Sequence, residues 1–166
     1  MTHIERTKSK IDTPESLFAK IEDWRKQDLK VVFTNGCFDI LHKGHVDYLN
    51  RASDFGDRLV VGINSDASVS KLKGPSRPIQ DEDSRCWLLA SLACISAVVL
   101  FSEDTPIELI DSIKPDVLIK GGDYSLNEIV GSKEVIQNGG SVEIIPFLNG
   151  YSTSLIEAKI RRSDIH

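Results

Sequence analysis

Five short apolar runs, with helix-patterned segments between them, constrain the fold of this chain more than any other feature. The runs are Val31–Phe33, Leu59–Ile63, Ala97–Phe101, Val117–Ile119 and Val142–Ile145. They are continuous rather than alternating, which is typical of strands buried on both faces of a parallel sheet. The sequence therefore predicts an α/β fold, a single doubly wound, Rossmann-like domain with a five-stranded parallel sheet and helices on both faces.

Residues 29–166 are expected to form this domain, because a chain of 166 residues suits a single folded unit with its own core. Residues 1–28 are expected to form a helical extension packed on it. A helix is predicted from Thr13 to Gln27, where a capping hydroxyl precedes a proline at the first helical position. Apolar side chains follow at helical spacing: Leu17, Phe18, Ile21 and Trp24.

Charge and composition limit the kinds of partner. The net charge of −5 at pH 7 disfavours broad binding to nucleic acid or to a membrane surface. Three cysteines without a C-x-x-C pair disfavour a disulfide framework or a zinc site and are typical of reduced thiols in the cytoplasm. The N-terminus lacks the apolar stretch of a secretory signal, and no apolar run is long enough to cross a bilayer. We expect a cytoplasmic protein with small-molecule partners and with neither nucleic acid nor membrane as a partner; assembly into a homo-oligomer is left open.

Polar residues follow directly after the predicted strands, at the sheet edge where ligands bind in doubly wound folds. The first cluster runs from Asn35 to His45 and reads Asn-Gly-Cys-Phe-Asp-Ile-Leu-His-Lys-Gly-His. It differs from the G-x-G-x-x-G of dinucleotide-binding domains and from the Gly-Lys-Ser/Thr of P-loop NTPases. His42 and His45 can donate hydrogen bonds to phosphate beside a helix N-terminus, and a glycine permits close backbone approach. The cluster predicts a phosphate pocket; the alternative is that both histidines only cap a surface helix.

The second cluster, Lys71–Arg77, lies in a polar segment predicted to be a loop after the next strand. Lys73 and Arg77 are its better candidates for closing over a triphosphate. The alternative is a solvated basic loop. Arg85, on the helix that follows, is a further candidate, and its alternative is a surface salt bridge with an acidic neighbour on its own helix.

Two later clusters offer further ligand-binding groups. Tyr151–Ser154 opens the last predicted helix, where hydroxyls and free N–H groups suit a phosphate, although they also suit an ordinary helix cap. Lys120–Tyr124 follows the fourth strand, and its paired glycines would let a base or ribose pack on the backbone. Asp123 can accept hydrogen bonds from hydroxyls there; the alternative is a plain glycine turn. Asn64, after the second strand, has the same ambiguity.

The first cluster has the form G-x-F-D-x-x-H-x-G-H and resembles the nucleotidyltransferase superfamily, which includes cytidylyltransferases and the catalytic domains of class I tRNA synthetases. In such a reaction the phosphate oxygen of a second substrate attacks the α-phosphate of a nucleoside triphosphate. That oxygen is ionised at neutral pH, so no catalytic base is needed. The work is in-line positioning and neutralisation of charge on the departing pyrophosphate.

From about Val31 to Arg161 the chain resembles the D-glycero-β-D-manno-heptose 1-phosphate adenylyltransferases, most specifically in Lys120-Gly-Gly-Asp-Tyr124 and Gly131-Ser-Lys-Glu134. The resemblance implies that ATP and the heptose 1-phosphate are converted to ADP-heptose and pyrophosphate, for the lipopolysaccharide core. It implies the stand-alone form of the enzyme, without the sugar kinase that some members carry. It also implies Mg²⁺ as cofactor, carried by ATP rather than by a protein metal site.

The same resemblance implies roles for individual residues. The catalytic residues would be His42, His45 and Lys73. The nucleotide-binding residues would be Asn35, Gly36, Phe38, Gly44, Asn64, Lys120, Gly121, Tyr151, Ser152, Thr153 and Ser154. The substrate-binding residues would be Asp39, Arg77 and Asp123.

Three other functions are compatible with parts of this pattern. The nearest is a cytidylyltransferase acting on a small phosphorylated alcohol such as glycerol 3-phosphate, because the triphosphate machinery would be the same. The second is a non-catalytic nucleotide-binding or regulatory module, against which the two histidines and the basic cluster argue. The third is a redox protein using Cys37, which is better explained as a small residue that fills space beside the turn.

Overall fold

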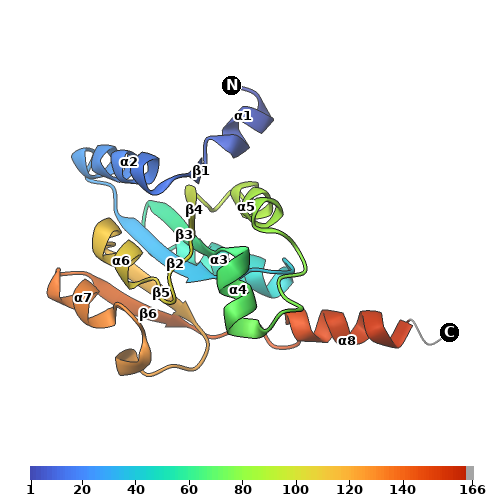
Figure 1. Cartoon of the computed structure of the whole chain (residues 1–166). Helices are drawn as coiled ribbons and strands as arrows, with labels where there is room; N and C mark the ends of the chain where they lie inside the picture. Colours follow the sequence, from blue (N-terminus) through green and yellow to red (C-terminus); the bar gives the residue numbers. More distant parts are fainter. Residues whose placement is uncertain (164–166) are drawn as a thin grey trace.

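The computed structural model describes residues 1–163, which form a sheet of six strands with parallel neighbours throughout (Figure 1). The strands are β1 (Ile11–Asp12), β2 (Val31–Gly36), β3 (Arg58–Asn64), β4 (Ala97–Phe101), β5 (Val117–Gly121) and β6 (Ser141–Ile145). Their order is β1-β4-β3-β2-β5-β6. The chain moves outward from β2 on one side and then crosses to β5 on the other. The switch point, where ligands bind in such sheets, therefore lies at β2.

The prediction of a five-stranded sheet was wrong by one strand. The additional strand, β1, has two residues and pairs with β4 at the sheet edge, with Ile11 opposite Val98 and Asp12 opposite Val99. A strand of two residues contains no apolar run that the sequence could reveal, and one of its two residues, Asp12, is acidic. Asp12 is accommodated because its carboxylate pairs with Lys20 at 2.6 Å.

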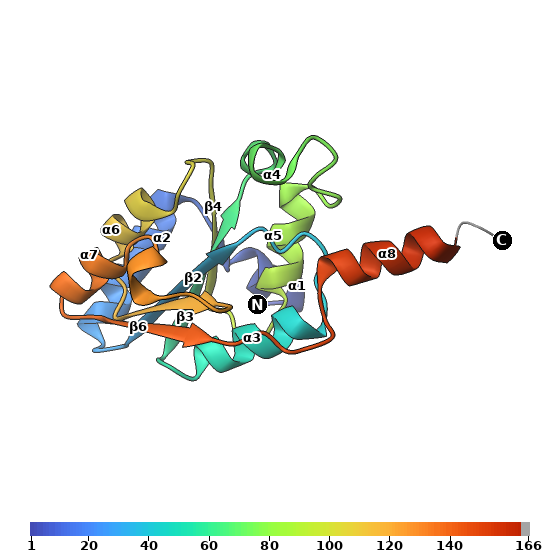
Figure 2. The ribbon, with the colours of Figure 1, turned by 90° about the horizontal axis from the view of Figure 1, so that it is seen from below.

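Helices cover both faces of the sheet, as predicted (Figure 2). They are α1 (His3–Lys8), α2 (Pro14–Lys26), α3 (Lys43–Ser53), α4 (Asp66–Lys73), α5 (Glu82–Ala90), α6 (Ile107–Ile113), the 3₁₀ helix η1 (Leu126–Glu128), α7 (Ser132–Gln137) and α8 (Thr153–Ser163). One apolar core packs α3 and α5 against the sheet, and the other packs α2, α6 and α7 against the opposite face. The two cores leave the carboxyl ends of the central strands free for a ligand.

The helix predicted near the N-terminus is observed as α2. The Thr13 hydroxyl accepts a hydrogen bond from the Ser16 N–H at 3.3 Å and caps the helix. Leu17 and Ile21 are almost fully buried, in the same core as Phe33 of the central strand. The segment before residue 29 thus contributes both an edge strand and part of one core.

The segment predicted as a loop after β3 contains a helix, α4. Ser65 begins it by accepting a hydrogen bond from the Ser68 N–H at 3.2 Å, and Val69 anchors it in the interior. With one buried apolar residue among polar ones, α4 has little of the periodicity that identifies a helix in sequence. Lys73 ends the helix beside Gly74, so its position is set by a regular element.

Arg85 does not pair with a neighbour on its own helix. Its side chain is fully buried, and its guanidinium lies 2.8 Å from an Asp66 carboxylate oxygen at the start of α4. It also donates to the carbonyl oxygens of Cys37 at 2.8 Å and Gln80 at 3.1 Å. A buried charge is tolerated when its donors are satisfied. Arg85 therefore braces the turn after β2 against the segments that flank α4 and α5.

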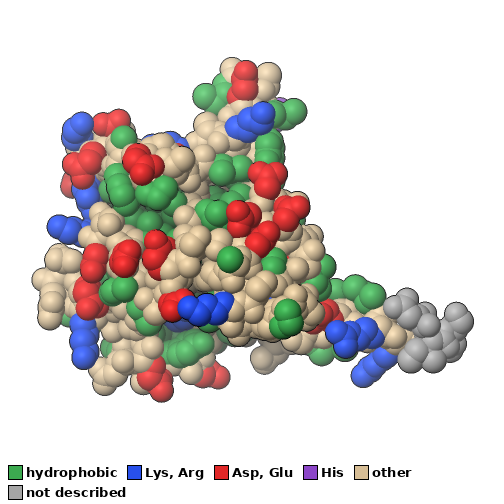
Figure 3. All heavy atoms as spheres, in the orientation of Figure 1, with side chains coloured by type: hydrophobic (Ala, Val, Ile, Leu, Met, Phe, Trp, Pro, Cys, Tyr) green, Lys and Arg blue, Asp and Glu red, His purple; other side chains and the backbone are tan. Residues whose placement is uncertain are grey.

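The last helix, α8, projects from the body of the molecule in both ribbon views (Figures 1 and 2). Leu155 and Ile160 on it are more than half exposed. On the face in Figure 3, acidic and basic side chains are interspersed over the body, in keeping with the modest net charge of −5. Within residues 1–163 no helix combines the length and the apolar character needed to cross a bilayer.

Candidate active site

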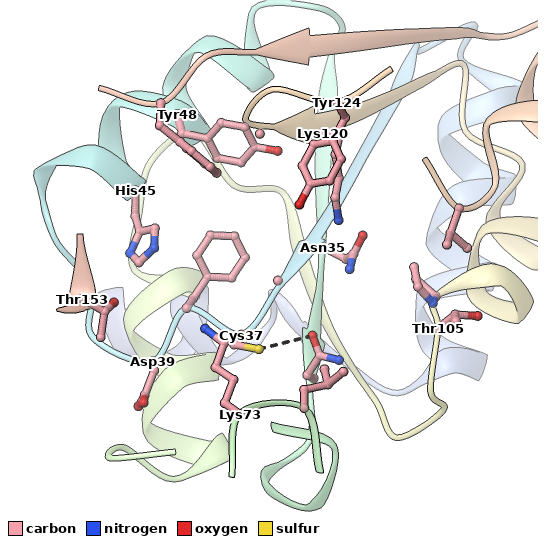
Figure 4. Close-up of a pocket in the computed structure, with 18 of the residues that line it drawn as sticks. Asn35, Cys37, Asp39, His45, Tyr48, Lys73, Thr105, Lys120, Tyr124 and Thr153 are labelled. Carbon is pink, nitrogen blue, oxygen red and sulfur yellow. Dashed lines mark hydrogen bonds between the residues drawn. The ribbon is translucent and has the colours of Figure 1, made fainter. Parts of the chain in front are cut away.

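A cavity of about 560 Å³ opens at the carboxyl ends of β2, β3 and β5, a volume that suits a small-molecule ligand. Figure 4 shows His45 and Thr153 on one side of it, Thr105 on the opposite side, and Asn35 and Lys120 between them. Most of the predicted site residues lie on its wall: Asn35, Gly36, Phe38, Asp39, His45, Asn64, Lys73, Lys120, Gly121 and Thr153. Segments far apart in the sequence thus meet at one rim because they follow neighbouring parallel strands.

The remaining predicted residues do not line this cavity directly: His42, Gly44, Arg77, Asp123, Tyr151, Ser152 and Ser154. Asp123 lines a neighbouring hollow of about 500 Å³, together with Tyr124 and Phe147. The others lie behind the wall or at its edge, next to residues that do line the cavity.

The turn after β2 presents its two histidines as a stacked pair. The ring centroids of His42 and His45 are 3.8 Å apart, with 20° between the ring planes. His42 is the N-cap of α3, and its Nδ1 accepts a hydrogen bond from the His45 N–H at 3.4 Å. The predicted alternative of a helix cap is therefore realised for His42. Because Nδ1 accepts, the proton of the neutral ring is on Nε2, which can donate to a ligand.

Both imidazoles are held in the neutral form. Burial, together with the charge of the adjacent His42, lowers the pKa of His45 to about 4. Burial also lowers the pKa of His42. His45 Nδ1 is buried without a hydrogen-bond partner in the structure. An anionic group placed beside this pair would stabilise a protonated ring.

Two lysines bring positive charge to the cavity wall. Lys73 comes from the end of α4 and Lys120 from β5, and within residues 1–163 neither forms an ion pair with a carboxylate. Burial lowers the pKa of Lys120, whose ammonium lies 5.8 Å from the centroid of the Tyr124 ring. Lysines without a carboxylate partner in a cavity are suited to binding phosphate.

Cys37 lies between these cations but is not an activated nucleophile. Its Sγ donates a weak hydrogen bond to Asn64 Oδ1 at 3.8 Å. Burial raises the pKa of the thiol, although Lys73 and Arg85 act in the opposite direction. Since the thiolate is the reactive form, this environment disfavours nucleophilic or redox chemistry.

Two helix N-termini meet at the edge of the cavity. A Cβ added at Gly44, in the first turn of α3, would lie 3.0 Å from Tyr151 Cβ, just before α8 begins. The Lys43 ammonium lies 5.4 Å from the centroid of the Tyr151 ring. The Ser152 hydroxyl caps α8 by accepting a hydrogen bond from the Leu155 N–H at 3.1 Å. Each helix N-terminus carries partial positive charge and N–H groups without a helical partner, features that are suited to binding an anion.

Asp39 and Arg77, both predicted to bind substrate, bind each other. Arg77 Nη1 lies 2.7 Å from Asp39 Oδ2, and its Nη2 lies 3.2 Å from Glu157 Oε2 on α8. The Asp39 carboxylate also accepts the backbone N–H groups of Ile79 and Gln80. The sequence alone does not reveal this pairing, because the partners lie on segments that only the fold brings together.

Other residues on the cavity wall were missed in the sequence. Tyr48 lies on α3, where the helical pattern marks it as core, and its hydroxyl is 2.7 Å from the Thr34 hydroxyl. Thr105 follows β4, and Phe147, which is 60% exposed, follows β6. Phe147 packs so closely on the β5 end that a Cβ at Gly121 would lie 2.5 Å from its ring. The signal that identifies Thr105 and Phe147 is their place after a strand end.

No group of three or more His, Cys, Asp or Glu side chains able to hold a metal ion occurs within the described residues 1–163. Of the carboxylates near the phosphate-binding groups, Asp39 and Glu157 are engaged by Arg77, and Asp104, which lines the cavity, pairs with Lys71.

Comparison with known proteins agrees with this geometry. Residues 33–159 match the family described as cytidylyltransferase-like. The chain is 52% identical over 151 residues to the bifunctional protein HldE of Methylobacillus flagellatus, covering 91% of this chain and 31% of that protein. It is 47% identical over 164 residues to HldE of Azorhizobium caulinodans, covering 95% of this chain and 34% of that protein. The chain thus spans about a third of the length of these relatives.

Two solved structures are also similar. A lipopolysaccharide core biosynthesis protein from Thermoplasma volcanium is 31% identical, with a TM-score of 0.60 over 75% of this chain and 99% of that one. Pantoate-beta-alanine ligase from Francisella tularensis, at 15% identity, shares the fold, with a TM-score of 0.60 over 93% of this chain and 78% of that one. The match to the family model extends from β2 into α8 and includes every loop that forms the cavity. This chain belongs to the cytidylyltransferase-like family.

Proposed function

We propose that the chain is an adenylyltransferase that transfers the adenylyl group of ATP to the phosphate of D-glycero-β-D-manno-heptose 1-phosphate. The products are ADP-heptose, used in lipopolysaccharide core biosynthesis, and pyrophosphate. Support for the sugar acceptor comes from the Lys120-Gly-Gly-Asp-Tyr124 segment, from the HldE relatives and from the similar lipopolysaccharide core biosynthesis protein. Its partners are small molecules, and we place the reaction in the cytoplasm, where ATP is available.

The observation that carries the proposal is a cavity equipped to bind phosphates but without an activated nucleophile. Neutral histidines, lysines without carboxylate partners and two helix N-termini surround it, while the Cys37 thiol is held protonated by a raised pKa. Nucleotidyl transfer to a phosphate needs this combination, because the acceptor brings its own ionised oxygen.

In the proposed reaction the acceptor phosphate oxygen forms a bond to the α-phosphorus as the bond to the pyrophosphate oxygen breaks. His42 and His45 donate hydrogen bonds to the phosphate oxygens on which charge builds up. Lys73 and the turn from Ser152 to Ser154 hold the triphosphate, and Asp123 lies toward the nucleoside or the sugar. Magnesium carried by the triphosphate would neutralise its oxygens. These groups position the reactants and stabilise charge, and no covalent enzyme intermediate is required.

A coupled pyrophosphate assay across ATP, CTP, GTP and UTP, with a panel of sugar phosphates and glycerol 3-phosphate, tests the proposal. We expect pyrophosphate release with ATP and the heptose 1-phosphate. The His45→Asn variant should keep its circular dichroism spectrum but lose at least ~100-fold in turnover, the scale of losing a transition-state donor. Release with CTP and glycerol 3-phosphate alone would assign the chain as a cytidylyltransferase. No release with any pair would point to a binding module.

A further inference from the structure

Arg77 joins two carboxylates that belong to different elements of the rim. Its Nη1 lies 2.7 Å from Asp39 Oδ2 in the turn after β2, and its Nη2 lies 3.2 Å from Glu157 Oε2 on α8. The Arg77 side chain is 11% exposed and that of Asp39 is 1% exposed. A planar guanidinium can hold two carboxylates at once in fixed directions, which a lysine ammonium cannot do as well.

Asp39 anchors this bridge to the rest of the site. Besides Arg77, its carboxylate accepts the backbone N–H of Ile79 at 2.8 Å and that of Gln80 at 3.0 Å. The Asp39 side chain is buried, and its carboxylate oxygens already accept hydrogen bonds from groups of the protein itself. The pair thus fixes the chain after α4 to the turn that carries the two histidines.

The second arm of the bridge acts on a helix that has little other support. Beyond its first turns α8 projects away from the sheet in both ribbon views (Figures 1 and 2). Glu157 lies one turn after Thr153, which lines the cavity. Fixing Glu157 therefore fixes the direction of the helix axis, and with it the N–H groups of the first turn.

We propose that Arg77 is a positioning residue that straps α8 to the turn after β2, so that the phosphate-binding groups of both elements face one triphosphate. The inference rests on the proposed function for the identity of that ligand. In this role Arg77 and Asp39 need not touch the substrate. The strap aligns the Ser152–Ser154 turn with the histidines before the nucleotide arrives, and so lowers the ordering that binding requires.

Glu157→Gln tests the strap, because it removes the charge from the α8 arm, leaves at most a weaker neutral hydrogen bond there, and keeps the buried arm to Asp39 intact. Arg161→Met is the matched control: Arg161 is on the same helix, is 81% exposed, and lies 4.0 Å from the same Glu157 carboxylate. Arg77→Lys and Arg77→Gln remove the bridge itself. The measurements are the melting temperature, the KM values for ATP and acceptor, and the Kd of inorganic tripolyphosphate by calorimetry.

We expect Glu157→Gln to weaken tripolyphosphate binding and to raise the KM for ATP by about fivefold, the scale of one partly exposed charge-assisted pair. The KM for the acceptor and the melting temperature should stay close to the parent values. Arg161→Met should match the parent protein. Arg77→Lys should retain more tripolyphosphate affinity than Arg77→Gln, because it keeps the charge beside Asp39.

Unchanged tripolyphosphate affinity in Glu157→Gln would overturn the strap even if the parent enzyme turns over ATP. Equal increases in both KM values would also overturn it, because they would indicate a general structural role. The proposed function fails separately, if the parent protein releases no pyrophosphate from ATP with any acceptor. The strap would stand in that case if Glu157→Gln still weakened tripolyphosphate binding. A parent protein that does not bind tripolyphosphate would overturn the strap as well.

Discussion

At the scale of single residues, the site depends on the ionisation of its histidines. His45 is neutral because burial lowers its pKa to about 4 from the ordinary value of 6.5. A bound phosphate has the opposite effect, since it favours the charged ring. In the ligand-free protein the free energy of unfolding should therefore fall as the pH drops from about 6.5 to about 4, where the unfolded chain binds the extra proton.

Nucleotide binding should consequently take up a proton at pH 6. Calorimetry with ATP in two buffers of different ionisation enthalpy measures this uptake, and ATP affinity should rise as the pH is lowered from 8 to 6. His45→Asn should reduce the uptake, whereas His3→Asn, which changes an exposed histidine on α1, should not. ATP binding without proton uptake would contradict the contact between His45 and phosphate.

The place of the Asn35–His45 turn at the ligand-binding edge of the sheet could be predicted, because its motif is local in sequence and directly follows a strand. The pairing of Arg77 with Asp39 and Glu157 could not, since these residues are separated by dozens of positions and only the fold brings them together. The buried bond of Arg85 to Asp66 was missed for the same reason. In each case an arginine that the sequence offered as a ligand-binding residue forms an ion pair with a carboxylate of the protein itself.

At the scale of elements, the sequence predicted the strands with apolar runs and the well-capped helix α2, but not the shortest strand or the polar helix. Five strands were predictable because each contains a short, mainly apolar run, and α2 because Thr13 and Pro14 mark its start. The two-residue β1 and the polar α4 have no such signal. Strand β1 depends on its pairing with β4, and α4 depends on its Ser65 cap and the buried Val69. Neither produces a periodic pattern in the sequence.

The substitution Gly44→Ala tests the close contact between the starts of α3 and α8. The added Cβ would lie 3.0 Å from both His42 Cε1 and Tyr151 Cβ, closer than ordinary contacts, so the His42 ring or Tyr151 must shift by a few tenths of an ångström. We expect the KM for ATP to rise about tenfold, because small misplacements of binding groups are costly. The melting temperature should change little. Asn50→Ala, at an exposed position of the same helix, is the control, and equal kinetics in the two variants would show that the close approach is unimportant.

At the scale of the whole molecule, the two apolar cores and the sheet between them form one connected body. That residues 1–28 form an extension of a domain at residues 29–166 stays a prediction. The contacts of the segment with the rest of the chain bear on it. Leu17 is fully buried in the core that contains Phe33, and β1 completes the sheet edge beside β4. These contacts predict that the N-terminal segment unfolds together with the rest.

Leu17→Ala should lower the free energy of unfolding by about 2–5 kcal/mol, the usual cost of removing a buried leucine side chain. Denaturant unfolding followed by tryptophan fluorescence and by circular dichroism should remain a single transition for parent and variant. Ile4→Ala on α1, where the side chain is 63% exposed, should change the stability little. A separate early transition, lowered only by Leu17→Ala, would define residues 1–28 as an independent unit.

The strand order also has a consequence for how the molecule is made. Val31 of β2 bonds through its N–H to Asp116, 85 positions later, and β5 then pairs with β2 at the centre of the sheet. During synthesis β2 and β3 leave the ribosome before β5, so one edge of β2 stays unpaired until β5 follows. The Ser152–Ser154 turn emerges later still. A nascent chain therefore completes its central sheet only after β5 has emerged, and its nucleotide site only after that.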